Sequence, residues 1–193
     1  MPPAFVADET SRPAHSWRVL LLPYLDAGDL YDQYDFSEPW DGPNNHRLLD
    51  QRPRTYALHD RNEEPGSLTN YLVVVGPDTM WPGSQPTDEP FGGRKILIVE
   101  NVGADVPWTE PRDLHLDTMN FDLAASSAEG VSSSYLPAAV ALSDGTIRRL
   151  PAEKISPQEL RDLLTGKVDL KTALNAADFR LEDGRDRPKR DSQ

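Results

Sequence analysis

The N-terminal part of the chain alternates apolar and polar positions with a helical period. Positions i, i+3, i+4, i+7 and i+8 are occupied by Trp17, Leu20, Leu21, Tyr24 and Leu25. This spacing places all five side chains on one helix face. Ser16 is able to cap the start of such a helix, and Pro23 ends or kinks it because proline lacks a backbone N–H. A second short helical pattern follows over residues 30–34.

Further along, the apolar residues form runs that are typical of strands. Residues 69–75 are rich in β-branched and aromatic side chains, and residues 95–100 form an apolar run bounded by charge. Residues 138–150 contain two strand-like runs on either side of Asp144-Gly145, which is a strong hairpin signal. These patterns predict an antiparallel sheet that contains residues 69–75, 95–100 and the 138–150 hairpin.

A helix with well-marked ends is predicted after residue 156. Ser156 and Glu159 form a capping box, and Pro157 occupies the first helical position. The apolar stripe consists of Leu160, Leu163 and Leu164. Gly166 closes the helix. Together, the short helices and the antiparallel strands predict an α+β fold in which short helices pack on the sheet.

Length and composition divide the chain into one domain and a tail. The 193 residues fit a single domain, which we expect to span residues 1–168. Residues 169–193 are polar, and from residue 178 onward five basic and five acidic residues cancel. This composition predicts a charged, disordered tail. Residues 76–94, with four Pro and four Gly, are predicted to form a long loop.

The charge balance and the missing residue types exclude several functions. Lys and Arg total 20 against 32 Asp and Glu, a formal net charge of −12, which repels nucleic acid and anionic lipid. The absence of Cys excludes disulfides, thiolate metal sites and cysteine nucleophiles. No apolar run reaches the roughly 20 residues that span a bilayer. We therefore expect a soluble chain that neither binds nucleic acid nor inserts directly into a membrane.

The carboxylates that follow Trp108 are the main candidates for chemistry. Glu110 and Asp113 are suited to act as an acid/base pair or as oxygen ligands for Ca²⁺. A structural role is the favoured alternative, because such pairs arise by chance in an acidic chain. Trp81 or Trp108 could stack on a glycan or belong to the core. The sequence contains no nucleophile elbow, phosphate-binding loop or dinucleotide fingerprint, so we expect no enzymatic activity and no cofactor apart from Ca²⁺.

Several motifs occur in order along the chain. They are Pro2-Pro3-Ala4-Phe5-Val6, His15-Ser16-Trp17-Arg18, Pro39-Trp40-Asp41-Gly42-Pro43-Asn44-Asn45, Thr69-Asn70-Tyr71, Trp108-Thr109-Glu110-Pro111-Arg112-Asp113 and Asp144-Gly145. With these motifs, about residues 2–165 resemble the bacterial pilin-like family known as domain of unknown function 1559. The residues that carry the resemblance are Trp17, Trp40, Asp41, Trp108, Glu110, Pro111, Asp113, Asp144 and Gly145.

This resemblance implies a fold and a cellular location. Members of the family resemble type II secretion pseudopilins, which have a cleavable prepilin signal, a long hydrophobic N-terminal helix and an extracytoplasmic α+β head. The first residues of this chain align after that helix. The resemblance therefore implies a pilin-like head that is anchored to a membrane if a prepilin segment precedes it in the native protein.

The sequence departs from the family pattern at two places. The family has a His, then nine residues, then Asp-Gly; counting back from Asp144, the His position holds Ser134. The family also often has Cys-Pro where this chain has Leu58-His59. Any ligand site or disulfide that this His and Cys serve in relatives is therefore lost here, which favours a role of the retained motif residues in holding the fold.

The resemblance and the residues lead to one expected function and two alternatives. We expect a non-enzymatic head domain that acts in protein–protein assembly or surface binding outside the cytoplasm, with partners in a secretion or cell-envelope assembly. The first alternative is a small-ligand module that binds Ca²⁺ or a glycan around Trp108–Asp113. The second is a hydrolase that uses Glu110 and Asp113 as acid and base.

Overall fold

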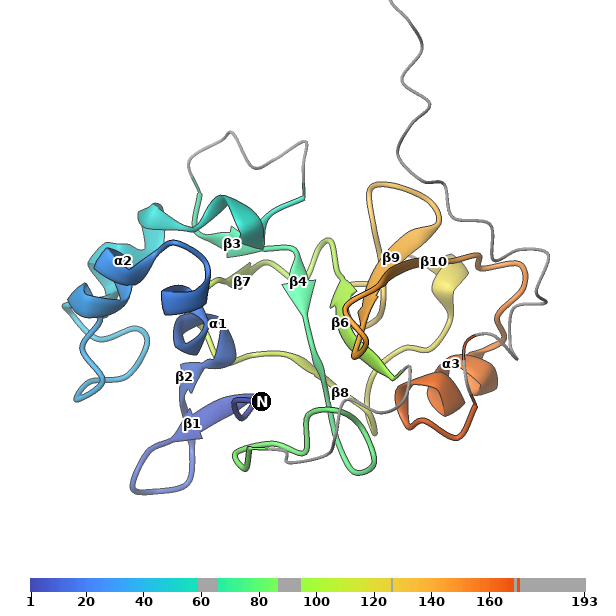
Figure 1. Ribbon diagram of the computed structural model, residues 1–193, viewed down its shortest axis with the longest axis horizontal. Helices are drawn as coiled ribbons and strands as arrows, with labels where there is room; N and C mark the ends of the chain where they lie inside the picture. Colours follow the sequence, from blue (N-terminus) through green and yellow to red (C-terminus); the bar gives the residue numbers. More distant parts are fainter. Residues whose placement is uncertain (59–65, 87–94, 126, 169, 171–193) are drawn as a thin grey trace, which may run out of the picture.

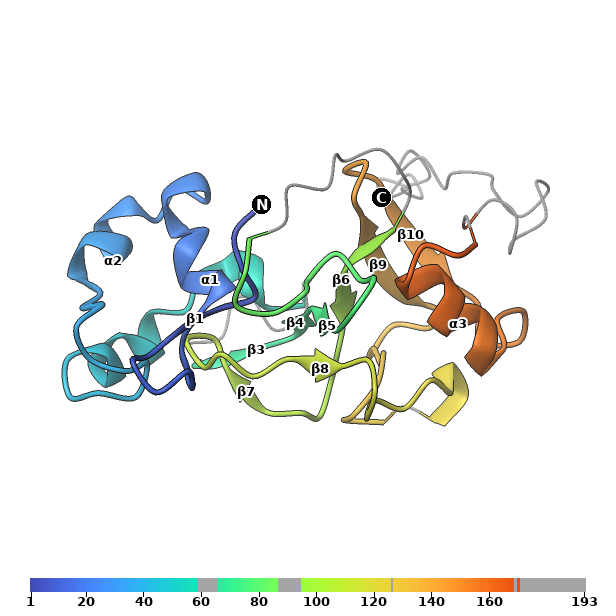
Figure 2. The ribbon, with the colours of Figure 1, turned by 90° about the horizontal axis from the view of Figure 1, so that it is seen from below.

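The chain has an α+β architecture, as the sequence pattern predicts. The computed structural model describes residues 1–58, 66–86, 95–125, 127–168 and 170. The helices of residues 1–58 lie at one end of the molecule and residues 138–168 at the other, with short strands between them (Figures 1 and 2). The predicted tail, apart from Leu170, and residues 87–94 of the predicted loop lie outside the described residues. No helix within the described ranges is long and apolar enough to cross a membrane.

The N-terminal end consists of a hairpin followed by short helices. Its elements are β1 (Phe5–Ala7), β2 (Pro13–Ser16), α1 (Trp17–Leu20), the 3₁₀ turn η1 (Leu22–Tyr24) and α2 (Gly28–Gln33), then the 3₁₀ segments η2 (Asn45–Gln51) and η3 (Arg54–Tyr56). Ser16 caps α1, its side chain accepting a hydrogen bond from the Arg18 N–H. As predicted, the helical run is broken near Pro23: α1 ends at Leu20 and the chain tightens into η1, because Pro23 cannot donate an intrahelical hydrogen bond.

The predicted strand 69–75 is divided into three short strands. These are β3 (Leu68–Thr69), β4 (Tyr71–Leu72) and β5 (Val74–Val75). They pair respectively with β7 (Val106–Pro107), β6 (Ile96–Glu100) and β8 (Leu114–His115). The β5–β8 pair is parallel. The strand is interrupted at Val73, whose N–H donates to the Asp113 carboxylate.

The main sheet and its hairpin confirm the prediction for the second half of the chain. The strand order is β10-β9-β6-β4, where β9 spans Ala138–Leu142 and β10 spans Ile147–Leu150, and each neighbouring pair is antiparallel. The turn between β9 and β10 contains Asp144-Gly145. Gly145 has a φ of +80°, a conformation that glycine adopts without strain. The short segment η4 (Leu123–Ala125) precedes this part of the sheet.

The capped C-terminal helix also forms as predicted. Helix α3 spans Pro157–Leu164, and Ser156 and Glu159 make both hydrogen bonds of the capping box. Its three leucines are fully buried in an aliphatic cluster with side chains of β6, β9 and β10. A second cluster, rich in aromatic residues, forms the core of the N-terminal end. The fold therefore has two hydrophobic clusters with different compositions.

Candidate functional site

A buried ion pair connects α1 to the segment that leads into β8. Arg18 Nη2 lies 2.6 Å from Asp113 Oδ1, and the two side chains are 0% and 3% exposed. The pair links two of the motifs, the one around Trp17 and the one that ends at Asp113, across 95 positions of sequence. Two segments that are distant in the sequence are thereby held together in the interior.

The remaining donors of Arg18 are also used. Its Nε donates to the Tyr71 carbonyl at 3.1 Å, and its Nη1 donates to Ser16 Oγ at 2.8 Å and to the Glu110 carbonyl at 3.2 Å. The guanidinium also lies 4.8 Å from the ring centroid of Trp17, within cation–π range. A buried cation with this set of partners fixes two segments, at Tyr71 and at Glu110–Asp113, relative to α1.

Asp113 accepts hydrogen bonds from three residues. Besides Arg18, the Val73 N–H donates to Oδ1 at 3.0 Å, and Trp17 Nε1 lies 3.3 Å and 3.2 Å from the two carboxylate oxygens. Burial raises the pKa of Asp113, although the charge of Arg18 and these hydrogen bonds act in the opposite direction. Burial likewise lowers the pKa of Arg18. Both shifts reflect the cost of removing charge from water, so each ion depends on its partner.

Glu110 is engaged by a second arginine. Its two carboxylate oxygens lie 2.9 Å and 3.1 Å from Nε and Nη2 of Arg112. Arg112 also donates to the carbonyls of Ala104 and Asp105, which anchors the loop before β7. Glu110 and Asp113 therefore each face their own guanidinium. In the part of the chain that the structure describes, no group of three or more His, Asp or Glu side chains is placed to hold a metal.

The tryptophans proposed for glycan stacking belong to the core. Trp81 and Trp108 are 2% and 0% exposed. Their indole N–H groups donate to the carbonyls of Leu97 and Leu49, and the ring of Trp108 stacks on Tyr56. Since neither ring offers a face to solvent, the expected glycan stacking on Trp81 or Trp108 does not fit this geometry.

The motif around Trp40 is a turn held by an asparagine. The buried side-chain amide of Asn45 donates to the carbonyls of Asp35, Glu38 and Pro39, while its oxygen accepts from the Asp35 N–H. A Cβ at Gly42 would lie 2.6 Å from the Glu38 side chain, so any other residue there requires this side chain to shift. Trp40 and Asp41 lie in this turn, Trp40 half-buried and Asp41 exposed.

The motif residues do not form one site. Trp17, Glu110 and Asp113 lie around Arg18, with Trp108 and Pro111 on the same segment as the two carboxylates. Asp144 and Gly145 lie in the β9–β10 hairpin at the other end of the molecule (Figure 1). Ser134, at the position of the family His, is exposed. His59, at the position of the family Cys-Pro pair, lies outside the described residues.

Sequence reasoning did not assign a role to Arg18. The available signal was its position, because it is the only charged residue between Trp17 and Leu25 in an otherwise apolar run. A cation in such a run requires a buried anion as partner. The sequence could not show which of the many carboxylates this would be.

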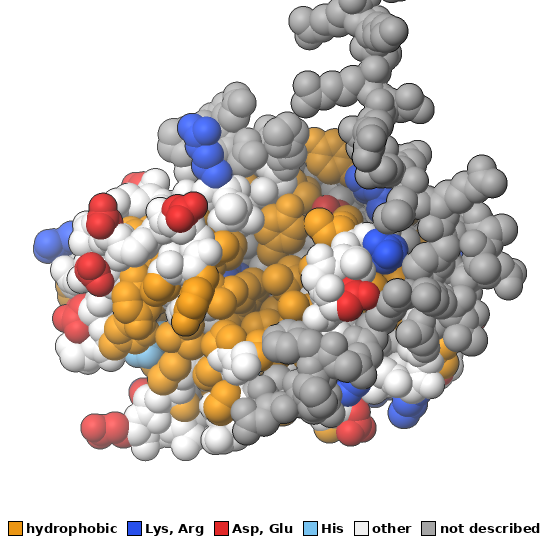
Figure 3. Space-filling view, viewed as in Figure 1, with side chains coloured by type: hydrophobic (Ala, Val, Ile, Leu, Met, Phe, Trp, Pro, Cys, Tyr) orange, Lys and Arg blue, Asp and Glu red, His pale blue; other side chains and the backbone are white. Residues whose placement is uncertain are grey.

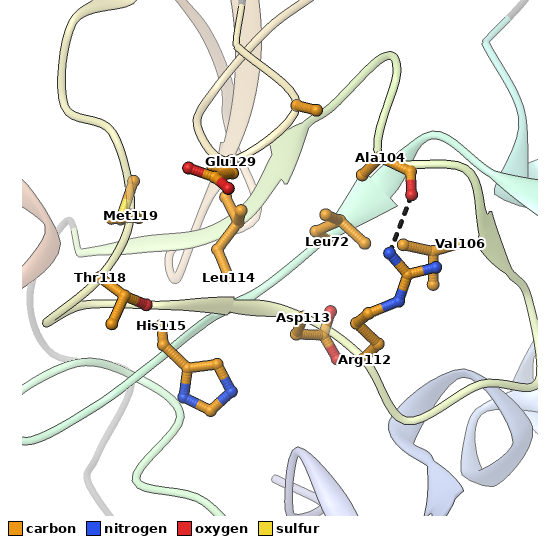
Figure 4. A pocket seen from close by; sticks show the side chains of 11 residues that line it. Leu72, Ala104, Val106, Arg112, Asp113, Leu114, His115, Thr118, Met119 and Glu129 are labelled. Atoms are coloured by element: carbon orange, nitrogen blue, oxygen red, sulfur yellow. Dashed lines mark hydrogen bonds between the residues drawn. The ribbon is translucent and has the colours of Figure 1, made fainter.

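A cavity of about 370 Å³ lies beside β8 (Figure 4). Apolar side chains of Leu72, Val106, Leu114 and Met119 line it, and the charged residues of the lining are Arg112, Asp113 and Glu129. In Figure 4 the guanidinium of Arg112 is turned toward the Ala104 carbonyl, to which it is hydrogen-bonded. The polar lining is therefore partly used within the protein.

One surface of the N-terminal end is distinctly apolar. Figure 3 shows hydrophobic side chains gathered in a hollowed area over the N-terminal segment, α1 and the short strands next to them. The partly buried hydrophobic residues that pack on the aromatic cluster are Met1, Phe5, Leu21, Leu25, Ala27, Tyr31, Leu97 and Ile98. Tyr24, between two of them in the sequence, is 82% exposed. We call the eight partly buried residues that pack on the aromatic cluster the apolar face.

Comparison with known proteins identifies the family. A family described as a protein of unknown function (DUF1559) matches residues 1–126. The chain belongs to this family. Both partners of the Arg18–Asp113 pair, and every residue of the apolar face, lie inside the matched region, whereas the β9–β10 hairpin and α3 follow it. No curated protein and no solved structure matches the chain.

Proposed function

We propose that this member of the DUF1559 family is a non-catalytic binding domain that attaches to other proteins through its apolar face. The single observation that carries the proposal is this face, whose half-buried hydrophobic residues come from the N-terminal segment, the turn after α1, α2 and β6 and pack against one aromatic cluster, beside a hollowed apolar area of the surface (Figure 3). Contiguous apolar surface on a domain of this size marks an interaction site. Removing roughly 400 Å² of it from water contributes about 10 kcal/mol before the costs of association.

The environment of the motif carboxylates supports a non-catalytic role. A general base needs a carboxylate that is free to take a proton from a substrate. Asp113 is instead enclosed with Arg18, and Glu110 is held by Arg112. A hydrolase that uses these two residues would have to break one of the ion pairs in every catalytic cycle.

The proposed setting is a secretion or cell-envelope assembly outside the cytoplasm. Support comes from the resemblance of the motifs to pseudopilin-like heads and from the family membership. Other proteins of such an assembly are the proposed partners. The domain would contribute a docking surface to it rather than a reaction.

Cross-linking of the full chain in a cell-envelope extract, followed by identification of the captured proteins, tests this function. Tyr24 is highly exposed and lies between Leu21 and Leu25 of the apolar face in the sequence, so we expect Tyr24→Ser to reduce the capture of specific envelope proteins. The matched control is Leu136→Ser, because Leu136 is similarly exposed, at 79%, but precedes β9 and lies beyond the Glu100 end of β6, away from Leu97 and Ile98. Equal capture by both variants, or no captured envelope protein with the unaltered chain, would count against the proposal.

Small-ligand binding is a second candidate function, favoured by the cavity beside β8. The carboxylate of Glu129 and the hydroxyl of Thr118 lie at the cavity above an apolar lining. Titration with millimolar Ca²⁺, followed by tryptophan fluorescence and melting temperature, tests whether the bound ligand is a divalent cation. A shift that disappears in Glu129→Gln would support it, and the absence of any shift would remove it.

A further inference from the structure

The border of the apolar face along α2 is strongly acidic. Residues 26–41 contain six acidic side chains and neither Lys nor Arg. Acidic side chains border the apolar area on the side of α2 in Figure 3. Because opposite charge on a partner would be attracted to this border, the charge provides information about what the face binds.

Part of this charge is not neutralised within the protein. Asp35 and Glu38 accept hydrogen bonds from neighbouring backbone N–H groups. Asp26, Asp29 and Asp32 are exposed, and their carboxylates form no hydrogen bond or ion pair with the residues that the structure describes. Asp26 precedes α2, and Asp29 and Asp32 belong to it. These three carboxylates remain available to cations.

A second copy of the chain is a poor occupant of the face. In a contact between two copies, the acidic border of each copy meets another acidic molecule. Each copy also carries a net charge of −12. Since like charges across an interface oppose association, the occupant should be a different, cationic protein.

The position of β6 favours a helical occupant. Leu97 and Ile98 of the apolar face belong to β6, which lies between β9 and β4 in the sheet. On the side of β4, Val99 and Glu100 are paired with Leu72 and Tyr71, and the Leu97 carbonyl accepts from the Trp81 indole N–H, so little of this edge is left for a partner strand. An amphipathic helix satisfies its own backbone hydrogen bonds and presents an apolar stripe to a groove.

We infer that the apolar face binds a basic amphipathic helix of a partner protein, with its apolar stripe on Leu21, Leu97 and Ile98 and its Lys or Arg side chains beside α2. This inference rests on the proposed function and specifies the chemistry of the partner. Binding should weaken as salt is raised, because the exposed aspartates are screened within about 10 Å at 0.1 M.

Synthetic peptides of about 18 residues, or five helical turns, serve as probes for the full chain. The first carries Leu at helical i, i+3, i+4, i+7 spacing and Lys elsewhere. The second has the same composition with the stripe scrambled, and the third replaces every Lys with Glu. We expect the first peptide to bind, and the other two to bind at least about tenfold more weakly, in a fluorescence anisotropy titration.

Charge reversal on the protein provides the matched comparison. Asp29→Lys/Asp32→Lys should weaken binding of the Leu/Lys peptide about tenfold, whereas Asp117→Lys/Glu153→Lys makes the same change in net charge away from the face. Failure of the Leu/Lys peptide to bind, equal binding of the scrambled peptide, or equal loss in both double variants would overturn the inference. If Tyr24→Ser reduces capture of envelope proteins while Asp29→Lys/Asp32→Lys does not, the proposed function survives and the basic helix is wrong.

Discussion

The core of the N-terminal end contains three tryptophans and adjoins a buried ion pair, whereas the buried core beneath α3 consists of aliphatic side chains and one methionine. The first arrangement requires specific partners at specific distances, because an unpaired buried charge is costly. The stability of the aliphatic core depends mainly on how completely its side chains fill the available volume, because a cavity among them reduces stability. The two ends of the molecule should therefore respond to different kinds of substitution.

The largest effect is expected when the ion pair is broken. Asp113→Asn keeps the shape of the side chain but leaves Arg18 buried without a counter-charge, which should destabilise the fold by about 3–5 kcal/mol in urea unfolding. Arg18→Met/Asp113→Leu removes both charges and should recover part of this loss. Unchanged stability of Asp113→Asn would show that this carboxylate does not hold the N-terminal end together.

A cavity substitution is the corresponding test at the other end. Leu163→Ala in α3 removes a side chain that is 0% exposed and should cost about 2–5 kcal/mol. Leu136→Ala is the control, because Leu136 is 79% exposed and its truncation should leave the urea midpoint nearly unchanged. Similar midpoints for the two variants would mean that α3 does not cover a close-packed core.

The C-terminal end was easier to predict from the sequence than the N-terminal end, because its elements depend on residues that are close together in the sequence. The β9–β10 hairpin and the capping box of α3 depend on residues within four positions of each other, such as Ser156 and Glu159, and both were predicted. The strand 69–75 was predicted as one element, but its division depends on Val73 donating to Asp113, 40 positions away. The role of Arg18 depends on a partner that is 95 positions away, so local patterns could not identify it.

The N-terminal end should also lose stability in mild acid. His15 is 5% exposed, its Nδ1 lies 3.0 Å from the Tyr34 hydroxyl, and burial lowers its pKa below 6.5. Below pH 6.5 the unfolded chain therefore binds a proton that the folded chain does not, and stability falls until the folded pKa is reached. The loss is at most about 1.4 kcal/mol per pH unit.

Urea unfolding at pH 7.5 and pH 5.5 measures this dependence. We expect the difference between the two values to shrink in His15→Phe. His46→Phe is the control, because His46 is exposed. An unchanged difference in His15→Phe would assign the pH dependence to other groups.

The smallest effect is expected at the second carboxylate. The ion pair of Glu110 with Arg112 is partly solvated, with the two side chains 19% and 48% exposed, so Glu110→Gln should cost less than about 1 kcal/mol. We also expect the unaltered chain to be inactive on a panel of hydrolase substrates. Activity that disappears in Glu110→Gln would instead assign an acid/base role to this residue.

The central claim is that the motif carboxylates hold the fold while the apolar face makes the contacts with partners. Photo-cross-linking from position 24, with the linked partner peptide mapped by mass spectrometry, tests it most directly. The account predicts a link to a Lys- or Arg-bearing amphipathic segment of another protein, and no such link from the same photoreactive side chain at position 136. Links from both positions to the same peptide, or from position 24 only to a second copy of this chain, would contradict it.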